Sequence, residues 1–107
     1  MDPSISIWYI RPVEFEWDLS KELENIRKHR VSFLEAADSF SDPDGFQLTD
    51  IEHSQAEPRF YWVGRSGGGR TLTTRFTRRG NVIRIIGSAS WRKFRRLYDE
   101  RTQPRRS

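Results

Sequence analysis

The stretch that decides the fold lies between residues 59 and 90. It reads Arg59-Phe60-Tyr61-Trp62-Val63-Gly64-Arg65, then Leu72-Thr73-Thr74-Arg75-Phe76-Thr77, then Val82-Ile83-Arg84-Ile85-Ile86. These three runs of β-branched and aromatic residues are separated by Ser66-Gly67-Gly68-Gly69 and by Arg79-Gly80-Asn81. Such runs joined by short glycine-containing segments predict an antiparallel β-meander with two hairpin turns.

Each of the three runs carries arginine among apolar neighbours. In the second run Leu72, Thr74 and Phe76 fall on one face and Arg75 on the other, because successive side chains of a strand point to opposite faces. One face is expected to form the core and the other to meet an anion. A lone strand arginine is usually just a solvated residue, but recurrence on three neighbouring strands favours a binding surface.

A first helix is predicted over residues 19–29. Asp18 is a suitable N-cap, and the apolar residues Leu19, Leu23 and Ile26 follow at helical spacing and form a narrow stripe.

A second helix is predicted to begin at Ser32. Ser32-Phe33-Leu34-Glu35 is a capping-box sequence, in which the Ser32 hydroxyl accepts from the Glu35 amide and the Glu35 carboxylate from the Ser32 amide. Its apolar residues Phe33, Ala36, Ala37 and Phe40 have helical spacing, and Asp42-Pro43 ends it. The two helices should form a hairpin with almost no loop.

The remaining elements are weaker predictions. Residues 5–17 alternate as an edge strand interrupted at Pro12, residues 46–49 alternate as a short strand, and residues 50–55 read as a polar loop. Ser90 is expected to cap a C-terminal helix that has Trp91, Phe94 and Tyr98 on one face and a basic second face. We expect one domain over residues 1–101 and a disordered basic tail over residues 102–107.

Length and composition exclude several classes of protein. A chain of 107 residues is large enough for one core but not for two. It has no cysteine, no apolar run near the roughly 20 residues that cross a bilayer, and no signal-peptide pattern at its N-terminus. A cytoplasmic protein with no membrane partner is expected.

The net charge of +4 conceals an asymmetry between the two halves of the chain. Residues 1–57 carry 13 acidic and 5 basic side chains, whereas residues 58–107 carry 2 acidic and 14 basic ones. Only three of the 19 basic residues are lysine. Because the planar fork of arginine suits phosphate and stacks on bases, this bias favours a nucleic-acid partner.

No motif of nucleophilic or cofactor chemistry is present. Gly67-Gly68-Gly69 lacks the lysine and the following helix of a phosphate-binding loop, so it is interpreted as a flexible turn. The only histidines are His29 and His53, without metal-ligand spacing. The sequence therefore predicts neither a metal nor a cofactor.

General acid and base chemistry on a phosphodiester remains. Arg59, Arg75 and Arg84 can stabilise the developing charge from rigid strands. His29 at the end of the first helix is a candidate acid or base, although capping helical carbonyls is an equally good role for it. Glu57 is a second candidate base, and a structural pair with Arg59 is its more ordinary role. Further RNA contacts are expected from Lys21, Lys28, Arg65, Arg79, Trp91, Arg92, Lys93 and Arg95.

The order and spacing of many residues over about residues 13–98 resemble those of BrnT-type toxins. The matching positions of the first half are Phe15-Glu16-Trp17-Asp18, Lys21, Asn25, Lys28-His29, Val31-Ser32-Phe33, Glu35-Ala36-Ala37, Phe40 and Asp42-Pro43. Those of the second half are Asp50, His53-Ser54, Glu57-x-Arg59-Phe60, Gly64, Thr77-x-Arg79-Gly80 and Ile83-Arg84-Ile85-Ile86.

The resemblance implies an α+β, RelE-like fold in which an N-terminal strand and a two-helix hairpin pack on an antiparallel sheet, followed by a C-terminal helix. It also implies an endoribonuclease toxin of a type II toxin-antitoxin pair, which inhibits translation and growth. The lack of metal-ligand spacing among the residues adds the expectation that this cleavage needs no metal ion. The implied partners are RNA, a BrnA-like ribbon-helix-helix antitoxin and, within a toxin-antitoxin complex, a second toxin copy and promoter DNA. In the antitoxin-bound state the arginine-rich sheet face and C-terminal helix should be covered by an acidic or amphipathic segment.

Three positions depart from the pattern of the family. Arg30 stands where glycine is common after Lys-His, Gly87-Ser88-Ala89-Ser90 replaces Ser-Ala-Arg, and Phe94-Arg95 replaces a Glu-Arg pair. One arginine and one carboxylate are thus missing, which leaves an alternative function: a non-catalytic module that binds nucleic acid or a partner through the same basic face.

Overall fold

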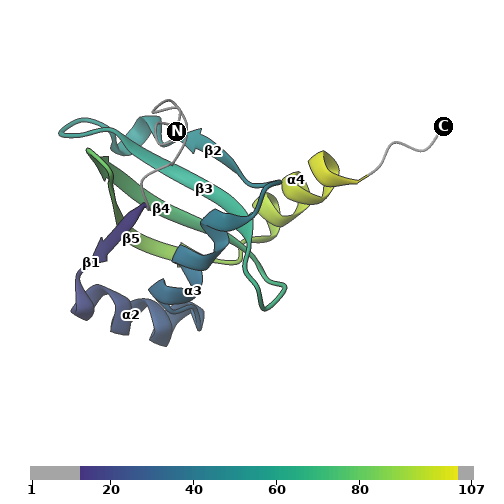
Figure 1. Ribbon diagram of the computed structural model, residues 1–107, viewed down its shortest axis with the longest axis horizontal. Coiled ribbons are helices and arrows are strands. Elements are labelled where there is room, and N and C mark those ends of the chain that lie inside the picture. Colours follow the sequence, from purple (N-terminus) through teal and green to yellow (C-terminus); the bar gives the residue numbers. More distant parts are fainter. Residues whose placement is uncertain (1–12, 104–107) are drawn as a thin grey trace, which may run out of the picture.

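The computed structural model describes residues 13–103 and contains one five-stranded sheet of order β1-β5-β4-β3-β2 (Figure 1). The strands are β1 (Glu14–Trp17), β2 (Phe46–Thr49), β3 (Arg59–Arg65), β4 (Thr71–Arg79) and β5 (Val82–Ala89). The helices are α2 (Leu19–His29), α3 (Phe33–Asp38) and α4 (Arg92–Thr102), with short 3₁₀ turns η1 (Ser39–Ser41) and η2 (Ile51–His53). No described helix is long and apolar enough to cross a membrane. Residues 5–12 of the expected N-terminal strand and residues 104–107 of the expected tail lie outside the described residues. The expected start of the tail at residue 102 is wrong, because Thr102 is the last residue of α4.

The predicted meander is confirmed as β3, β4 and β5, which pair antiparallel in sequence order. Gly69 and Gly80 adopt positive φ angles of 90° and 61° in the two turns, which explains glycine at both positions. The register of β4 and β5 shifts between Arg75 and Phe76, where β5 contains a bulge.

The edge strand β1 differs in direction from the antiparallel strands of the meander. It runs parallel to β5, with Glu14 opposite Val82 and Trp17 opposite Ile85. Parallel neighbours require a long crossover. Here that crossover contains α2, α3 and the other three strands, so the pairing could not be predicted from local pattern.

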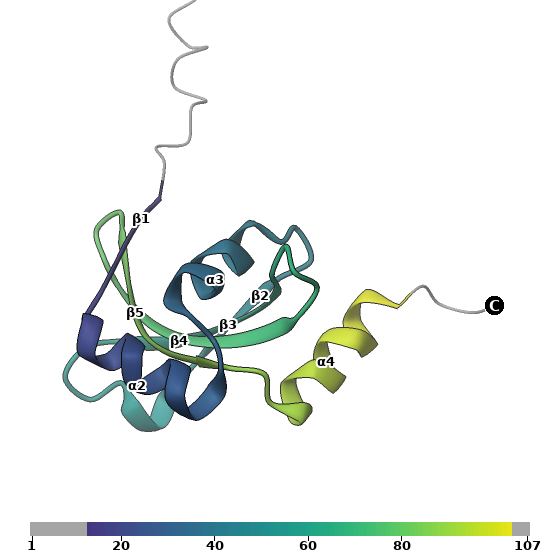
Figure 2. The ribbon, with the colours of Figure 1, turned by 90° about the horizontal axis from the view of Figure 1, so that it is seen from below.

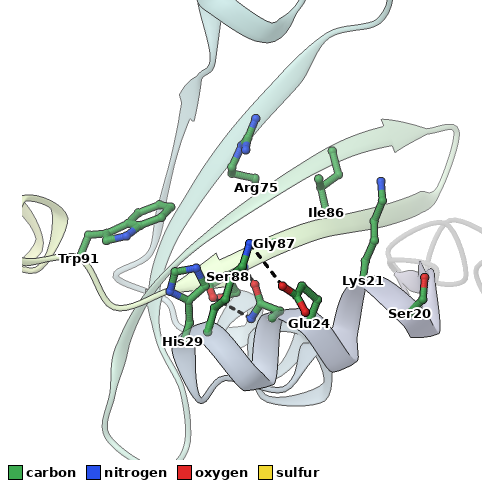
Figure 3. A pocket seen from close by; sticks show the side chains of 11 residues that line it. Ser20, Lys21, Glu24, His29, Arg75, Ile86, Gly87, Ser88 and Trp91 are labelled. Carbon is green, nitrogen blue, oxygen red and sulfur yellow. Dashed lines mark hydrogen bonds and ion pairs between the residues drawn. The ribbon is translucent and has the colours of Figure 1, made fainter.

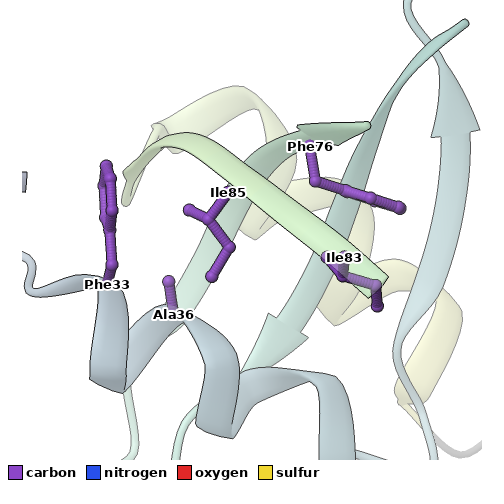
Figure 4. Close-up of a cluster of buried hydrophobic side chains, with 5 residues drawn as sticks. All are labelled: Phe33, Ala36, Phe76, Ile83 and Ile85. Carbon is purple, nitrogen blue, oxygen red and sulfur yellow. The ribbon is translucent and has the colours of Figure 1, made fainter. Parts of the chain in front are cut away.

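The two faces of the sheet are covered by different helices (Figure 2). On one face α3 contributes Phe33 and Ala36 to a core with Phe76, Ile83 and Ile85, all at most 2% exposed (Figure 4). On the other face α4 packs Tyr98, Phe94 and Leu97 against Phe46, Leu48 and Val63. Only part of this second face is covered, and α2 flanks it next to β5.

A buried asparagine attaches α2 to the sheet, whereas the expected apolar stripe of this helix is exposed. Leu19 and Leu23 are 64% and 59% exposed. Asn25 is 8% exposed, and its Nδ2 donates to Val31 O at 2.9 Å and to Ser88 O at 2.8 Å, while its Oδ1 accepts from Ser88 N at 3.0 Å. Helical periodicity therefore predicted the helix correctly but did not predict its buried side.

The capping box at α3 is half confirmed. Ser32 Oγ accepts from Glu35 N at 3.1 Å, as predicted. The Glu35 carboxylate instead accepts from Ser66 Oγ at 2.8 Å and forms an ion pair with Arg70. Because this pairing fixes α3 against the turn between β3 and β4, the carboxylate is not directed back to Ser32.

The start of α4 also differs from the prediction. Trp91 occupies the N-cap without a side-chain capping bond, and the predicted cap Ser90 donates from Oγ to Thr71 O at 2.8 Å. Further along, Tyr98 Oη donates to Asp42 Oδ2 at 2.6 Å, and burial with this hydrogen bond raises the pKa of Tyr98 to about 12. These two contacts hold the start and the second half of α4 to the body of the protein.

Candidate functional site

A pocket of about 340 Å³ opens on the partly covered face of the sheet, between α2, β4, β5 and the residue that precedes α4 (Figure 3). Figure 3 shows Trp91 on one side of Arg75 and Lys21 on the other. Five residues singled out from the sequence line this pocket: Lys21, Lys28, His29, Arg75 and Trp91. They come from three segments far apart in the chain, so the fold brings together a cationic and aromatic lining.

The α2 wall of the pocket is positioned by Asn25, which is itself part of the lining. One turn later His29 ends the helix, and its ring packs edge to face on Trp91 with centroids 6.2 Å apart. Glu24 pairs with Arg27 at 2.5 Å and with Lys28 at 3.4 Å. Hydrogen bonding to Arg27, with Lys28 adding less, lowers the pKa of Glu24 to about 2.

Arg75 forms the floor of the pocket. It lies on the central strand β4 between Tyr61 of β3 and Gly87 of β5, and its side chain is 28% exposed. Gly87 carries no side chain that could cover the neighbouring guanidinium. The only ion pair of Arg75 within residues 13–103 is to Asp50, at 3.6 Å, and its buried Nε has no hydrogen-bond partner in that range. The Nε is shielded from solvent, so the Nη groups are the donors that remain for an anion.

Asp50 joins Arg75 to a second histidine. The Asp50 side chain is 5% exposed, and its Oδ1 and Oδ2 lie 3.1 and 3.0 Å from His53 Nδ1. Burial raises the pKa of Asp50, but the His53 hydrogen bond and the charges of His53 and Arg75 outweigh it, so the pKa is lowered overall. Burial, and then the charge of Asp50, raises the pKa of Tyr61.

In the sequence, residues 50–55 read as a polar loop, and neither Asp50 nor His53 has an expected role in binding or catalysis. The available signal was their three-residue spacing, which places both side chains on one side of a single turn. That the turn lies beside Arg75 depends on the pairing of β2 with β3, which aligns Thr49 with Phe60.

Three predicted catalytic residues lie outside the pocket lining. Arg84 lies on β5 and pairs with Glu16 of β1 at 2.6 Å. Glu57 precedes β3 and pairs with Arg79 at 3.4 Å, so it is paired with a different arginine from the expected Arg59. The guanidinium of Arg59, at the start of β3, forms no ion pair within the described part of the chain.

Of the other predicted RNA contacts, Arg79 ends β4 and pairs with Glu57, whereas the rest lie on α4 or beside it. Arg65 stacks on Tyr98 with its Cζ 5.3 Å from the ring centre, and Lys93 lies over Phe94 at 5.1 Å. Arg95 Nη1 donates to Ser90 O at 2.6 Å, and Arg92 lines a separate groove with Arg95. These residues form a second basic region rather than part of the pocket.

Metal ligands do not gather at this site. Across residues 13–103, no group of three or more histidine, aspartate or glutamate side chains is arranged to hold a metal ion. The pocket lining itself offers a guanidinium, two lysine ammonium groups and an imidazole, which can bind anions and transfer protons, beside the carboxylate of Glu24.

Comparison with known proteins identifies the family. A crystal structure of the Brucella abortus ribonuclease toxin BrnT, determined at 1.1 Å resolution, superposes with a TM-score of 0.55 and 20% identity, covering 74% of this chain and 96% of that one. No curated protein sequence matches the chain significantly. The model of the family described as "Ribonuclease toxin, BrnT, of type II toxin-antitoxin system" matches residues 17–96. The chain therefore belongs to the BrnT family of ribonuclease toxins of type II toxin-antitoxin systems.

Proposed function

We propose that this chain is a metal-independent endoribonuclease, in which a ribose 2′-hydroxyl attacks the adjacent phosphodiester. The observation that carries the proposal is Arg75, a largely unpaired guanidinium on the floor of a pocket that Lys21, Lys28, His29 and Trp91 also line. Such a pocket suits a phosphate with a base on one side of it.

The reaction needs fixed cations for the charge that develops on phosphorus. Arg75 fits this role because its rigid central strand holds the guanidinium in place before substrate arrives. Lys21 and Lys28 contact the phosphates on either side as mobile point charges. Lys28 is the weaker contact of the two because Glu24 lies 3.4 Å from it.

The reaction also needs a proton donor and a stacking surface. His29 is exposed at the end of α2 and lines the pocket, so its imidazole can reach a leaving oxygen bound there. Trp91, 38% exposed and in contact with His29, offers a ring face on which an unpaired base can stack.

RNA extends beyond the pocket in this proposal. Arg59 and Arg84 lie on the same face of the sheet as Arg75, and Arg65, Arg79, Arg92, Lys93 and Arg95 add positive charge around it. Glu57 acts as the structural partner of Arg79 rather than as a base.

The cellular setting follows from the proposed chemistry. Cleavage of cellular RNA in the cytoplasm stops translation and growth, and a BrnA-like antitoxin covers the basic face until it is removed. A second toxin copy and the promoter DNA complete the proposed complex.

The test uses purified, antitoxin-free protein and an end-labelled RNA oligonucleotide. Cleavage should persist in excess EDTA, should yield a 2′,3′-cyclic phosphate and a 5′-hydroxyl, and should stop when one 2′-deoxy nucleotide replaces the attacking residue. Loss of cleavage in EDTA that Mg²⁺ restores would refute metal independence. Salt-sensitive binding without any product would favour the non-catalytic module.

A further inference from the structure

The Asp50–His53 pair lies outside the pocket lining but next to Arg75, from which Asp50 is 3.6 Å away, and it has no part in the function proposed above. Asp50 contacts Arg75, which also lines the pocket of His29, so Arg75 links the surroundings of the two histidines. α2 follows the edge strand β1, and η2 follows the opposite edge strand β2. Figure 1 shows them at opposite edges of the sheet, and Figure 2 shows both on the same side of it. A phosphate bound to Arg75 would have one histidine on either side.

The loop that carries the pair is held firmly to the sheet. Asp50 N donates to Arg59 O at 2.8 Å, and Ser54 Oγ donates to Asp50 O at 2.6 Å while it accepts from Arg59 N at 3.0 Å. These three hydrogen bonds bridge the start of β3 and both ends of the turn. Hydrogen bonds of the Asp50 backbone and the Ser54 hydroxyl to Arg59 therefore hold the turn that carries His53 in place.

The carboxylate of Asp50 fixes the orientation of the His53 ring. An ionised carboxylate only accepts hydrogen bonds, so Nδ1 carries the proton and donates it to Asp50. In the neutral ring Nε2 then bears the free lone pair. The His53 side chain is 49% exposed, which makes Nε2 accessible to a substrate hydroxyl, while Asp50 remains buried at 5%.

We infer that His53 is the general base of the reaction, held in place by Asp50, and that it works opposite His29 as the general acid. His53 Nε2 takes the proton of the 2′-hydroxyl, and the 2′-oxygen forms a bond to phosphorus. The bond from phosphorus to the 5′-oxygen breaks, and that oxygen takes a proton from His29. The products are a 2′,3′-cyclic phosphate and a 5′-hydroxyl, with His53 protonated and His29 neutral. This inference rests on the proposed ribonuclease function.

The experiment separates base from acid with two substrates. One is an RNA oligonucleotide with a single cleavable linkage, and the other replaces its bridging 5′-oxygen by sulfur, a leaving group that needs no proton. His53→Ala should slow cleavage of both substrates by about 100-fold or more, the usual loss for a proton-transfer group. Added imidazole should restore part of the activity. His29→Ala should be slow on the oxygen substrate and near wild type on the sulfur substrate.

Two further variants test whether any loss of activity comes from unfolding rather than from the missing imidazole. His53→Asn keeps a donor toward Asp50 but cannot accept the proton, so it should lose as much activity as His53→Ala. Ile51→Ala lies in the same turn, is 83% exposed in the wild type and should cleave at the wild-type rate. Thermal melts of all variants should stay close to that of the wild type.

The possible failures are distinguishable. If the wild type cleaves RNA and His53→Ala and His53→Asn do so at the same rate, the inference is overturned while the proposed function stands. If the sulfur substrate rescues His53→Ala, His53 is the acid and the assigned role is wrong. A wild-type protein that cleaves neither substrate refutes the proposed function, and the inference falls with it.

Discussion

Asn25 forms hydrogen bonds with both the carbonyl oxygen and the amide of Ser88, 63 residues further along the chain, at 2.8 and 3.0 Å. A third bond, to Val31 O, makes this side chain the junction of α2, the following loop and β5. The apolar residues of α2 are largely exposed, so this junction determines where Lys28 and His29 stand relative to Arg75.

Removal of that junction should cost both stability and activity. Asn25→Ala leaves three buried backbone groups without a partner, and we expect it to lower the free energy of unfolding by about 2 to 4 kcal/mol. RNA cleavage by the remaining folded protein should also fall, because α2 is no longer fixed. Urea unfolding and a cleavage assay measure the two effects. The control Leu23→Ala, 59% exposed on the same helix, should change stability by less than about 0.5 kcal/mol.

Arg75 and Arg84 should differ in importance although both are strand arginines on one face. Arg75→Lys keeps the charge but loses the planar fork, and Arg75→Ala loses both, so cleavage should fall in that order, reaching about 100-fold or more for alanine. Arg84 is already paired with Glu16 at 2.6 Å and lies outside the pocket lining. A partly exposed ion pair of this kind contributes about 1 kcal/mol or less. Arg84→Ala should therefore lower the cleavage rate by less than about tenfold. Equal losses in single-turnover assays would contradict the assignment of Arg75 as the central cation.

The sequence predicted the order of the elements because each has a local signal. The meander follows from three β-branched runs and two glycine turns, and the helices from Asp18, Ser32 and their spacing. Contacts between distant segments have no such signal. The parallel pairing of β1, the bonds of Asn25 to Ser88 and the ion pair of Glu35 with Arg70 each join positions more than 30 residues apart.

The same division explains the candidate site. Lys28, His29, Arg75 and Trp91 were chosen for chemical type, and the fold places them in one pocket. Chemical type alone could not separate Arg75 from Arg84. Both pair with a carboxylate, but Arg84 does so closely at 2.6 Å, whereas Arg75 lies 3.6 Å from Asp50 and lines the pocket. His53 was passed over because its partner Asp50 becomes buried only when β2 pairs with β3.

Stability should fall in acid through the Glu35–Arg70 pair. The hydrogen bond from Arg70 lowers the pKa of Glu35 below its ordinary value of 4.5. Its stabilising effect is therefore complete above about pH 4.5 and is lost as the pH falls through the lower folded value. Glu35→Gln should be less stable than the wild type at pH 7 and should lose less stability between pH 5 and pH 3. Chemical unfolding at a series of pH values tests this, and parallel curves for the two proteins would contradict it.

Arg30 ends α2 in a left-handed conformation, with φ 59° and ψ 32°, and its amide donates to Ile26 O at 2.9 Å. A side chain with a Cβ is strained in this conformation, whereas glycine is not. Arg30→Gly should therefore raise the free energy of unfolding by about 0.5 to 1 kcal/mol. Arg30→Ala keeps the Cβ and should show no such gain. A stabilised alanine variant would indicate that charge rather than backbone strain is responsible.

Phe33 belongs to the hydrophobic core and not to the pocket, so its replacement should change stability without changing the chemistry. Its ring is fully buried between α3 and the sheet and meets Trp17 edge to face at 6.1 Å, on the opposite side of the sheet from Arg75. Phe33→Ala should cost about 3 to 5 kcal/mol through lost transfer energy and the cavity it leaves, a large part of the total stability of a domain this size. Since no group near the pocket changes, cleavage per folded molecule should stay at the wild-type rate and total activity should fall only with the folded fraction.

The neighbouring Leu34, 71% exposed, provides the matched control as Leu34→Ala, which should leave both stability and activity intact. Thermal melts beside cleavage assays at a temperature where Phe33→Ala is still folded decide the point, because a folded Phe33→Ala protein that no longer cleaves RNA would mean that the core beneath β4 sets the geometry of Arg75.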